Sequence, residues 1–461
     1  MELTFKELVN AINGTILVDN KNYDFKEFCI DTRNVKKDDI FVAIKGERFN
    51  ANDYAIEALE KGALIAIVEE VKFDINDAIG KGTIIKVEST EKALLDLANY
   101  YRKKLDIKVV AVTGSTGKTS TKDLVAAVLS DKYKVFKTKG NFNSSIGLPL
   151  MIFQLTSDID VAVLEMGMSD LGEISVLAKT AMPDIAVITN IGLSHIENLK
   201  TQENILKAKM EVAEYFNNNN VLILNSEDKL LNSVTSNSYK IEKIGYNHEY
   251  DVYASNIILR EEETEFLAHM NNQSAVFTLN MAGKHNVLNS MLAICVAKNL
   301  GLTFEEMQRG LKNLEATSMR LQLIKKDEIT IINDCYNASP DSMKSSLDVL
   351  ATYKNKRKVA ILGDMYELGD ETERAHFEVG KYAKDKVELL LAIGENINSF
   401  KKGFENENIL LYKTKEECIK DLTNIIKKDD VILVKASRGM KLEDVTYALE
   451  ALELHKGGEL H

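Results

Sequence analysis

The fold of this chain is decided by the stretch Val109-Val110-Ala111-Val112-Thr113-Gly114-Ser115-Thr116-Gly117-Lys118-Thr119-Ser120. The apolar, β-branched run 107–113 is typical of a buried strand. Apolar residues recur at helical spacing after the loop, at Leu124, Val125, Val128 and Leu129. The short loop between the two runs ends in Gly-Lys-Thr, as phosphate-binding loops do. The stretch therefore predicts a strand, a phosphate loop and a helix, in that order.

The loop carries groups that suit a nucleoside triphosphate. Backbone N–H groups at a helix N-terminus attract phosphate oxygens, Lys118 adds a positive charge, and the Thr119 hydroxyl can ligate Mg²⁺. We therefore expect the phosphates of a nucleotide to bind Gly114, Ser115, Thr116, Gly117, Lys118, Thr119 and Ser120. The strict Walker pattern has a glycine where this chain has Val112, which indicates a distinct subfamily of nucleotide enzymes. The alternative for this stretch alone is an ordinary structural turn.

Composition narrows the class of protein. With 461 residues the chain is too long for one domain, and its 45% hydrophobic and 28% charged residues are ordinary for globular proteins. The net charge of -12 argues against a nucleic-acid-binding surface. Four widely spaced cysteines form no C-x-x-C motif, and no apolar run approaches 18 residues. We therefore expect a cytoplasmic protein that does not insert into a membrane.

Strands and helices alternate in three successive segments, which predicts an α/β fold with three domains. Residues 1–105 form a small N-terminal α/β domain, 106–316 a central doubly wound, mostly parallel sheet with the phosphate loop, and 317–461 a Rossmann-like domain. The helices expected in the first segment cover 54–61 and 91–105. The expected strands cover 40–44, 63–68, 107–113, 160–165, 184–189, 221–225, 328–333, 357–362, 388–393 and 430–434.

Polar residues follow several of these strands. Because ligands gather beyond the carboxyl ends of parallel strands, we expect Glu165 and the loop 189–195 to converge on the phosphate loop. Glu165 and His195 are candidate Mg²⁺ or Mn²⁺ ligands, and a capping Glu with a hydrogen-bonded loop His is the alternative. On the helix predicted from about 201, nothing in the residues themselves separates Lys207 from Lys209.

The third segment has comparable loops at 333–342, 363–369 and 435–440. Each follows a predicted strand, at the edge of the sheet where function concentrates. Each could also be no more than a tight loop.

Together these loops resemble those of the Mur ligases. Residues 113–120 are similar to the family's T-G-[ST]-x-G-K-[TS]-[ST], which also lacks the first Walker glycine, and 140–150 resemble G-N-x-N-N-x-I-G-x-P. Residues 333–340, 362–369 with His376, and 435–441 resemble N-D-S-Y-N-A-N-P, L-G-D-M-x-E-L-G…H and V-K-G-S-R-G-M-K. The last three are typical of the family members that add D-alanyl-D-alanine.

The resemblance implies an ATP-dependent ligase that joins D-Ala-D-Ala to UDP-MurNAc-tripeptide through an acyl phosphate, in peptidoglycan precursor synthesis. It implies two Mg²⁺ ions and a monomer. Lys209 lies in Ala208-Lys209-Met210-Glu211, which matches the A-K-x-E whose lysine is carbamylated. The implied catalytic residues are Lys118, Glu165, His195 and Lys209. The implied metal ligands are Thr119, Glu165, His195 and carbamylated Lys209.

The same resemblance implies further contacts. Asn286 and Asn289 match the adenine-binding G-x-H-N-x-x-N, Arg320 matches the hinge arginine near the ATP phosphates, and Asp334 belongs to the same nucleotide site. The implied substrate-binding residues are Thr32, Arg33, Lys45, Asn141, Asn143, Tyr336, Asn337, Ser437 and Arg438. Near Lys45 the chain has Asn50 and Asn52 where the family has D-A-H-D.

Three alternatives remain: a sister ligase that adds another amino acid, a regulatory P-loop NTPase that makes no bond, and a binding module without catalysis. A GTPase switch would carry N-K-x-D, which Asn20-Lys21-Asn22-Tyr23 fails at its last position. The presence of Lys118, Glu165, His195 and Lys209 argues against a binding module without catalysis.

Overall fold

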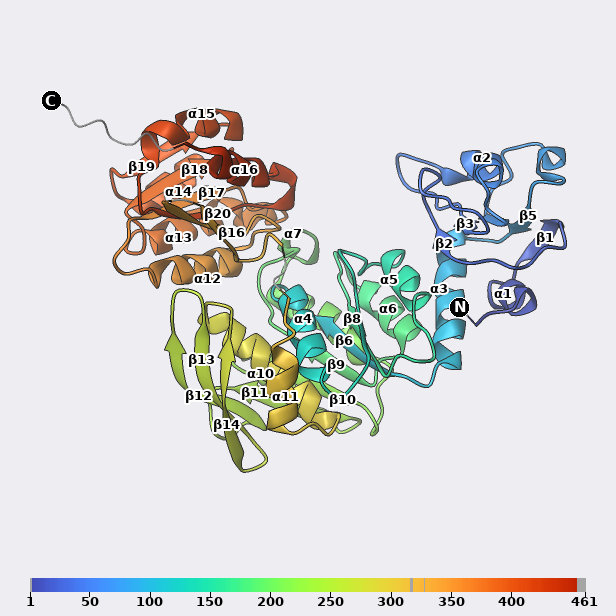
Figure 1. Ribbon diagram of the computed structural model, residues 1–461, viewed down its shortest axis with the longest axis horizontal. Helices are drawn as coiled ribbons and strands as arrows, with labels where there is room; N and C mark the ends of the chain where they lie inside the picture. The colour runs from blue at the N-terminus through green and yellow to red at the C-terminus, as the bar shows by residue number, and fades with distance from the viewer. Residues whose placement is uncertain (1, 316–317, 327, 454–461) are drawn as a thin grey trace.

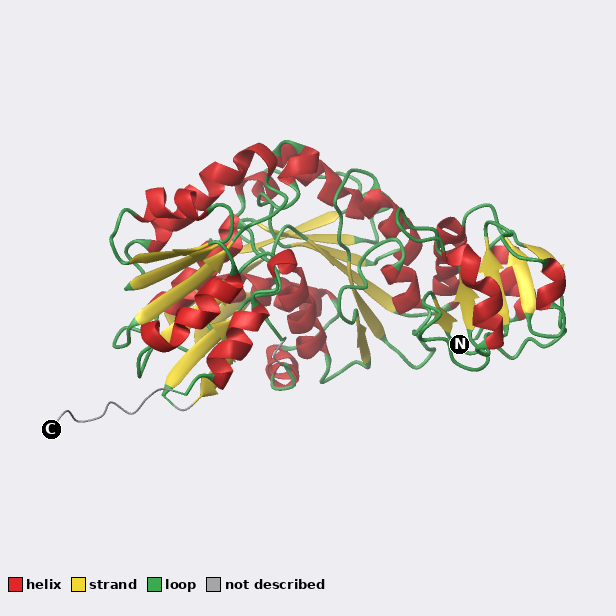
Figure 2. Ribbon diagram, turned by 90° about the horizontal axis from the view of Figure 1, so that it is seen from above, coloured by secondary structure: helices red, strands yellow, loops and turns green. Residues whose placement is uncertain are grey.

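The computed structural model describes residues 2–315, 318–326 and 328–453, and within them three sheets follow one another along the chain. Each sheet is flanked by helices, which confirms the α/β fold class. The N-terminal and C-terminal segments lie on either side of the central one, as the blue, cyan-to-yellow and orange-to-red parts of Figure 1 show. In the view from above, helices run along the faces of the strands (Figure 2).

The N-terminal segment holds a five-stranded sheet in the order β1-β5-β4-β3-β2, in which β1 is antiparallel to β5 and the other pairs are parallel. Its strands are β1 (Thr15–Val18), β2 (Phe28–Cys29), β3 (Ile40–Val42), β4 (Ile65–Val68) and β5 (Thr83–Lys86). Its helices are α1 (Phe5–Ala11), η1 (Ala51–Tyr54), α2 (Ala55–Glu60), η2 (Ile75–Ala78) and α3 (Thr90–Lys104). The expected helices at 54–61 and 91–105 correspond to α2 and α3.

Helix α3 joins the first sheet to the second. Its N-terminus is capped by Ser89, whose side chain accepts a hydrogen bond from the backbone N–H of Lys92. Leu94, Leu97 and Tyr101 are buried. The buried guanidinium of Arg102 donates to the Ala181, Leu105 and Ile107 carbonyl oxygens. Because a buried cation needs such partners, this side chain fixes how α3 docks on the central segment.

The central sheet has nine described strands in the order β14-β13-β12-β11-β10-β9-β6-β8-β7. The strands are β6 (Lys108–Thr113), β7 (Val135–Lys137), β8 (Val161–Glu165), β9 (Ile185–Ile188), β10 (Val221–Asn225), β11 (Lys240–Gly245), β12 (Val252–Leu259), β13 (Thr264–Met270) and β14 (Gln273–Leu279). The helices are α4 (Lys118–Leu129), α5 (Gly147–Ile152), α6 (Glu173–Ala181), α7 (Ile196–Leu199), α8 (Gln202–Met210), η3 (Glu211–Ala213), α9 (Lys229–Asn232), α10 (Lys284–Asn299) and α11 (Phe304–Leu311).

Strand β6 shows why this sheet is covered on both faces. Val109 and Ala111 pack in one cluster with residues of α5 and α6, whereas Val110 and Val112 pack in another with residues of α4 and α10. Successive side chains of a strand point to opposite faces, so an uninterrupted apolar run fits a strand buried on both sides. The expected doubly wound arrangement is confirmed.

The far edge of this sheet differs from the sequence-based expectation. Strands β12, β13 and β14 are joined antiparallel, and buried and half-buried residues alternate along β13. Such alternation is typical of antiparallel strands with one face on the core. The sheet is therefore mostly parallel, as expected, with an antiparallel end that was not predicted.

The C-terminal segment holds a six-stranded sheet in the order β15-β16-β20-β17-β18-β19, parallel except where β15 meets β16. Its strands are β15 (Gln322–Lys326), β16 (Ile329–Asn333), β17 (Lys358–Gly363), β18 (Leu389–Ile393), β19 (Ile409–Tyr412) and β20 (Val431–Lys435). Its helices are α12 (Pro340–Ala351), η4 (Gly369–Glu371), α13 (Thr372–Ala383), α14 (Ile397–Phe404), α15 (Lys415–Ile425), η5 (Arg438–Met440) and α16 (Glu443–Ala451).

The division at 105/106 falls between α3 and β6 and remains a prediction. The boundary expected at 316/317 lies outside the described residues. Among the helices that the structure describes, none is long and apolar enough to cross a membrane.

Candidate active site

The site begins at three neighbouring strands of the central sheet. Strand β6 lies between β8 and β9 and is parallel to both, so the loops that follow these strands leave the same edge. The phosphate loop follows β6, Glu165 ends β8, and the loop 189–195 follows β9. The expected convergence of these three loops is therefore confirmed.

The phosphate loop leads directly into α4. Gly117 precedes the helix with φ of 76°, in the left-handed region that favours glycine. Because glycine has no side chain, it cannot cap the first N–H groups of α4, which have no intrahelical partner. Those donors are available to an anion, and the helix dipole adds to the attraction.

A clamp from the β9 loop holds Thr116. The Asn190 side chain accepts a hydrogen bond from the Thr116 N–H at 2.9 Å and donates one to the Thr116 hydroxyl at 2.6 Å. The Thr189 hydroxyl donates to the Thr116 carbonyl oxygen. At Gly114, with φ of 149°, an added Cβ would clash with the Thr189 hydroxyl. A glycine is therefore required where β9 approaches the loop.

Glu165 faces the start of α4. Its Oε2 accepts a hydrogen bond from the Thr119 hydroxyl at 2.8 Å, and its Oε1 accepts one from Asn143 Nδ2 at 2.9 Å. Glu165 and Thr119 are both buried. The predicted metal ligands Thr119 and Glu165 therefore lie together, and Asn143 is the third member of this group.

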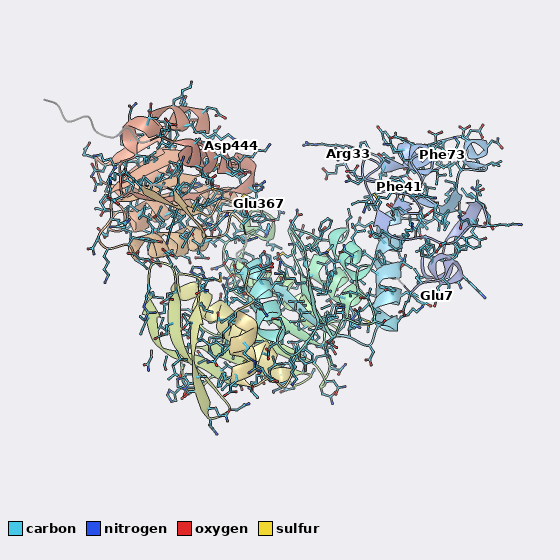
Figure 3. The ribbon with its side chains drawn as sticks, in the orientation of Figure 1. Glu7, Arg33, Phe41, Phe73, Glu367 and Asp444 are labelled. Atoms are coloured by element: carbon cyan, nitrogen blue, oxygen red, sulfur yellow. The ribbon has the colours of Figure 1, made fainter. Side chains whose placement is uncertain are left out.

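His195 has a different partner. Its Nδ1 lies 2.7 Å from Oε2 of Glu367, which comes from the loop between β17 and η4. Figure 3 labels Glu367 on the side of the C-terminal segment that faces the central one. Glu165 and His195 were predicted as a pair, but each contacts a different side chain. Glu367, the partner of His195, was not among the predicted site residues.

Two lysines meet near the loop. Lys118 Nζ donates to the Gly114 carbonyl oxygen at 2.8 Å. Burial lowers the pKa of Lys118, and the negative charge of nearby Glu165 opposes this shift only in part. Burial, reinforced by the positive charge of Lys118, lowers the pKa of Lys209 well below its ordinary value. Lys209 is 2% exposed, whereas Lys207 on the same helix is exposed. Lys118 lines the cavity over the phosphate loop, whereas Lys209 lies outside its wall.

A cavity of about 470 Å³ opens over the phosphate loop. Both the central and the C-terminal segments line it. The predicted site residues in its wall are Ser115, Thr116, Gly117, Lys118, Thr119, Ser120, Asn141, Asn143, Glu165, His195, Asn286, Asn289, Arg320, Asp334, Tyr336 and Asn337. A neighbouring cavity of about 840 Å³ shares Ser120, Asn286 and Arg320 with it.

The C-terminal wall of the cavity is held by a buried ion pair. Lys435 Nζ lies 2.5 Å from Asp334 Oδ2, and the Ser346 hydroxyl donates to the same oxygen at 2.6 Å. Asp334 Oδ1 accepts the N–H of Leu321 at 3.1 Å, next to Arg320. The Arg320 guanidinium lies 4.1 Å from the Tyr336 ring centre, a cation–π distance.

Asn286 and Asn289 lie on the first turns of α10 and face each other, with Asn289 Nδ2 donating to Asn286 Oδ1 at 3.2 Å. Asn286 Nδ2 donates to the Ala282 carbonyl oxygen. Asn289 also approaches the phosphate loop, since a Cβ added to Gly117 would lie 3.1 Å from its Oδ1. Asn289 therefore brings α10 close to the phosphate loop.

The remaining predicted substrate residues lie outside the wall of this cavity. Arg33 pairs with Asp31 at 2.7 Å and Lys45 with Glu70 at 2.6 Å, and the Thr32 carbonyl oxygen accepts from Lys61. Figure 3 shows Arg33 projecting from the N-terminal segment. Ser437 Oγ accepts the N–H of Tyr366 at 2.8 Å, and Arg438 pairs with Glu443 at 2.8 Å.

Asn50 and Asn52, which depart from the family pattern, have a structural role. Asn52 is fully buried, and its Oδ1 accepts the N–H groups of Glu69 and Glu70. Asn50 Nδ2 donates to Glu70 Oε2 at 2.9 Å. The two amides thereby fix Glu70, the partner of Lys45.

The chemistry of the donor set fits magnesium. Within the described part of the chain, no group of three or more His, Cys, Asp or Glu side chains is placed to hold a metal ion. Mg²⁺ is commonly bound by one or two protein oxygens together with substrate phosphates and waters. The hydroxyl of Thr119 and the carboxylate of Glu165, beside a phosphate loop, are a donor set of that kind.

Sequence reasoning missed Lys435, Asn190 and Glu367 as individual residues. Lys435 and Glu367 both lie in predicted loops that follow predicted strands, so their positions were signals. Their partners, Asp334 and His195, are far away in sequence, so no spacing pattern could pair them.

Comparisons with known proteins agree with this arrangement. Two family models match, described as "Mur ligase middle domain" over residues 112–297 and "Mur ligase, glutamate ligase domain" over residues 319–438. A relative from Bacillus subtilis, named UDP-N-acetylmuramoyl-tripeptide–D-alanyl-D-alanine ligase, is 37% identical and the match covers 96% of this chain and 97% of the relative. A relative of the same name from Escherichia coli is 32% identical over 98% of this chain and 99% of its own.

Solved structures give the same picture. A crystal structure of MurF from Acinetobacter baumannii matches with a TM-score of 0.91 and 29% identity, covering 97% of this chain and 98% of that one. The MurF ligase of Thermotoga maritima, in complex with ADP, matches with a TM-score of 0.82 and 31% identity, covering 92% and 97%.

Proposed function

The chain belongs to the Mur ligase family, and from this premise we propose that the cavity over the phosphate loop joins D-Ala-D-Ala to UDP-MurNAc-tripeptide at the expense of ATP. The observation that carries the proposal is that one cavity is lined both by the phosphate loop and by the C-terminal residues Asp334, Tyr336 and Asn337. The nucleotide and the peptide substrates would meet there. The product is a precursor of peptidoglycan.

ATP is needed because a carboxylate is a poor electrophile in water. The terminal carboxylate of the tripeptide attacks the γ-phosphorus in line, so that a carboxylate oxygen–phosphorus bond forms, the bond to the β–γ bridging oxygen breaks, and ADP leaves. The amine of D-Ala-D-Ala, having lost one proton, then attacks the acyl carbon. The acyl carbon–oxygen bond then breaks, phosphate leaves and takes up the second proton from the nitrogen, and an amide bond remains.

The described residues suit these steps. Lys118 and the N–H groups at the start of α4 would bind the β- and γ-phosphates and stabilise the charge that develops on them. Arg320, stacked on Tyr336 and anchored beside Asp334, would reach the phosphates from the C-terminal side. Asn286 and Asn289 would contact the adenine, and the neighbouring cavity offers room for the rest of the nucleoside.

Magnesium would be held by Thr119 and Glu165, with His195 and carbamylated Lys209 as further ligands. When bound, Mg²⁺ neutralises phosphate charge and aligns the transferring group. Carbamylation requires a neutral amine, and the low pKa of buried Lys209 favours that state. The carbamate would place a negative charge beside Lys118, so the two side chains would attract each other.

The substrates would be held by residues from all three segments. Thr32, Arg33 and Lys45 would bind the uridine diphosphate, Asn141 and Asn143 the muramyl part, and Tyr336, Asn337, Ser437 and Arg438 the incoming dipeptide. Each of Arg33, Lys45 and Arg438 would exchange its present carboxylate partner for substrate. We further propose that the enzyme acts as a monomer in the cytoplasm.

A phosphate-release assay tests this function. With ATP, Mg²⁺ and UDP-MurNAc-tripeptide present, phosphate release is expected only when D-Ala-D-Ala is added, and Lys118→Ala is expected to lower it at least about 100-fold. Single D-amino acids or L-lysine serve as controls for a sister ligase. Release that a single amino acid supports as well as the dipeptide would refute the proposed specificity.

A further inference from the structure

The loop that carries Glu367 is fixed from within the C-terminal segment. The Met365 N–H donates to Nε2 of the buried His376 at 2.9 Å, and the Tyr366 N–H donates to the Ser437 hydroxyl at 2.8 Å. His376 Nδ1 lies 2.6 Å from the Thr372 carbonyl oxygen. Two consecutive backbone groups just before Glu367 are therefore held in place.

The same loop also touches the central segment through its backbone. The Glu197 N–H, at the start of α7, donates to the Glu367 carbonyl oxygen at 3.2 Å. A Cβ added to Gly369 would lie 3.2 Å from Glu197 Cα. The side-chain pair of His195 and Glu367 is thus one contact within a docked interface between α7 and the loop.

Both members of the pair adopt an uncommon backbone. His195 has φ of 64° and Glu367 has φ of 62°, the left-handed region in which residues other than glycine are rare. Strained residues of this kind cluster at functional sites. Here two of them, from two segments, place an imidazole against a carboxylate at 2.7 Å.

The chemistry of the pair fixes which imidazole nitrogen carries hydrogen. An ionised carboxylate only accepts hydrogen bonds, so the Nδ1 that faces Glu367 must be the donor. Nε2 is then the nitrogen left for the cavity, whose wall includes His195. A carboxylate that binds one imidazole nitrogen in this way orients the ring and sets its tautomer.

We propose that Glu367 is a positioning residue that the C-terminal segment delivers to His195, so that the imidazole presents Nε2 to the phosphate site only when the two segments are docked. The role of His195 at the phosphates rests on the proposed function. Glu367 itself acts through His195.

The test compares Glu367→Ala, Glu367→Gln and Glu373→Ala. Glu373 lies six positions along the chain in α13, and its side chain is 76% exposed in a surface pair with Lys402, so its removal is a matched control. Gln keeps an oxygen that can accept from Nδ1. Equal thermal midpoints for Glu367→Ala and Glu373→Ala establish that both variants fold.

The first readout is the tautomer of His195 in the ligand-free protein. The protein has seven histidines, so ring-¹⁵N-histidine spectra at pH 8 are assigned with His195→Gln. The Nδ1 of His195 is expected to carry hydrogen in the unmodified protein, in Glu367→Gln and in Glu373→Ala, and to lose that preference in Glu367→Ala. An unchanged Nδ1 resonance in Glu367→Ala would overturn the proposal.

The second readout is the rate of D-Ala-D-Ala-dependent phosphate release. Glu367→Ala is expected to lower kcat by about 10–100-fold while the KM for ATP changes less than about twofold, and Glu367→Gln to recover much of the rate. A Glu367→Ala rate equal to that of Glu373→Ala would also overturn the proposal. The spectra need no substrate, so they test the role of Glu367 independently of the ligase activity. If the unmodified protein formed no amide bond, only the proposed ligase function would be refuted.

Discussion

The Thr119 hydroxyl donates a hydrogen bond of 2.8 Å to the Glu165 carboxylate, joining the first turn of the helix after the phosphate loop to the end of the neighbouring strand. The pair is buried, and Asn143 occupies the other carboxylate oxygen. Two oxygen donors are therefore already in place where the phosphates of ATP would bring a magnesium ion.

Replacing Thr119 by Val is expected to lower D-Ala-D-Ala-dependent turnover at least about 100-fold, because the metal loses a ligand and Glu165 a partner. Thr121→Val is the matched control, since the Thr121 hydroxyl is buried and has no hydrogen-bond partner among the described residues. Steady-state kinetics over a range of Mg²⁺ concentrations measure both variants. Equal turnover for the two would contradict a role for the Thr119 hydroxyl.

Lys209→Ala is expected to lose most activity, and formate or acetate in the buffer is expected to restore part of it by supplying the missing carboxylate. The reason is that Lys209 is buried with a lowered pKa, which favours carbamate formation. Lys207→Ala changes an exposed lysine of the same helix and should keep full activity. Full activity of Lys209→Ala, unchanged by formate or acetate, would exclude a role for a carbamate on Lys209.

Gly114→Ala is expected to abolish nucleotide binding, because the new Cβ would collide with Thr189 and push β9 away from the loop. Gly80→Ala provides a control for backbone strain alone. Gly80 also has positive φ, of 78°, but no described atom lies within 4 Å of a Cβ built there. It should cost about 1–2 kcal/mol of stability and leave binding unchanged. Calorimetric titration with ADP measures binding, and wild-type affinity in Gly114→Ala would be inconsistent with the clamp.

His285 should make the protein less stable in acid. Burial lowers the pKa of His285 to about 4, whereas the unfolded chain titrates near 6.5, so between these pH values the unfolded state binds the proton. Neutral His285 therefore contributes its full share to the free energy of unfolding above pH 6.5. That share, on the order of 2–3 kcal/mol, is lost as the pH falls towards 4. Thermal midpoints from pH 7.5 to 4.5 should fall less steeply for His285→Gln. If the thermal midpoints of the unmodified protein and of His285→Gln fell equally with pH, His285 would not be the cause of the acid sensitivity.

Much of the fold could be predicted because local patterns decide it. The apolar runs at 107–113, 160–165 and 184–189 became β6, β8 and β9, and their shared carboxyl edge follows from parallel pairing alone. Uninterrupted apolar runs fit a sheet covered on both faces, which the two clusters around β6 confirm.

The misses have two physical causes. In the antiparallel strands β12 to β14, polar residues interrupt the apolar ones, and such a pattern carries less signal than a continuous apolar run. The partners of His195 and Asp334 are Glu367 and Lys435, which tertiary packing alone brings near. Motif spacing identified His195 and Asp334 as candidates but could not indicate which side chains hold them.

Activation of the tripeptide carboxylate by ATP is tested most directly by following its oxygen atoms. UDP-MurNAc-tripeptide labelled with ¹⁸O in its terminal carboxylate is incubated with the enzyme, ATP, Mg²⁺ and D-Ala-D-Ala, and the released phosphate is analysed by mass spectrometry. An acyl phosphate leaves one carboxylate oxygen on phosphorus, so each phosphate formed with an amide bond should carry one ¹⁸O. Phosphate without that label would contradict the ligase mechanism.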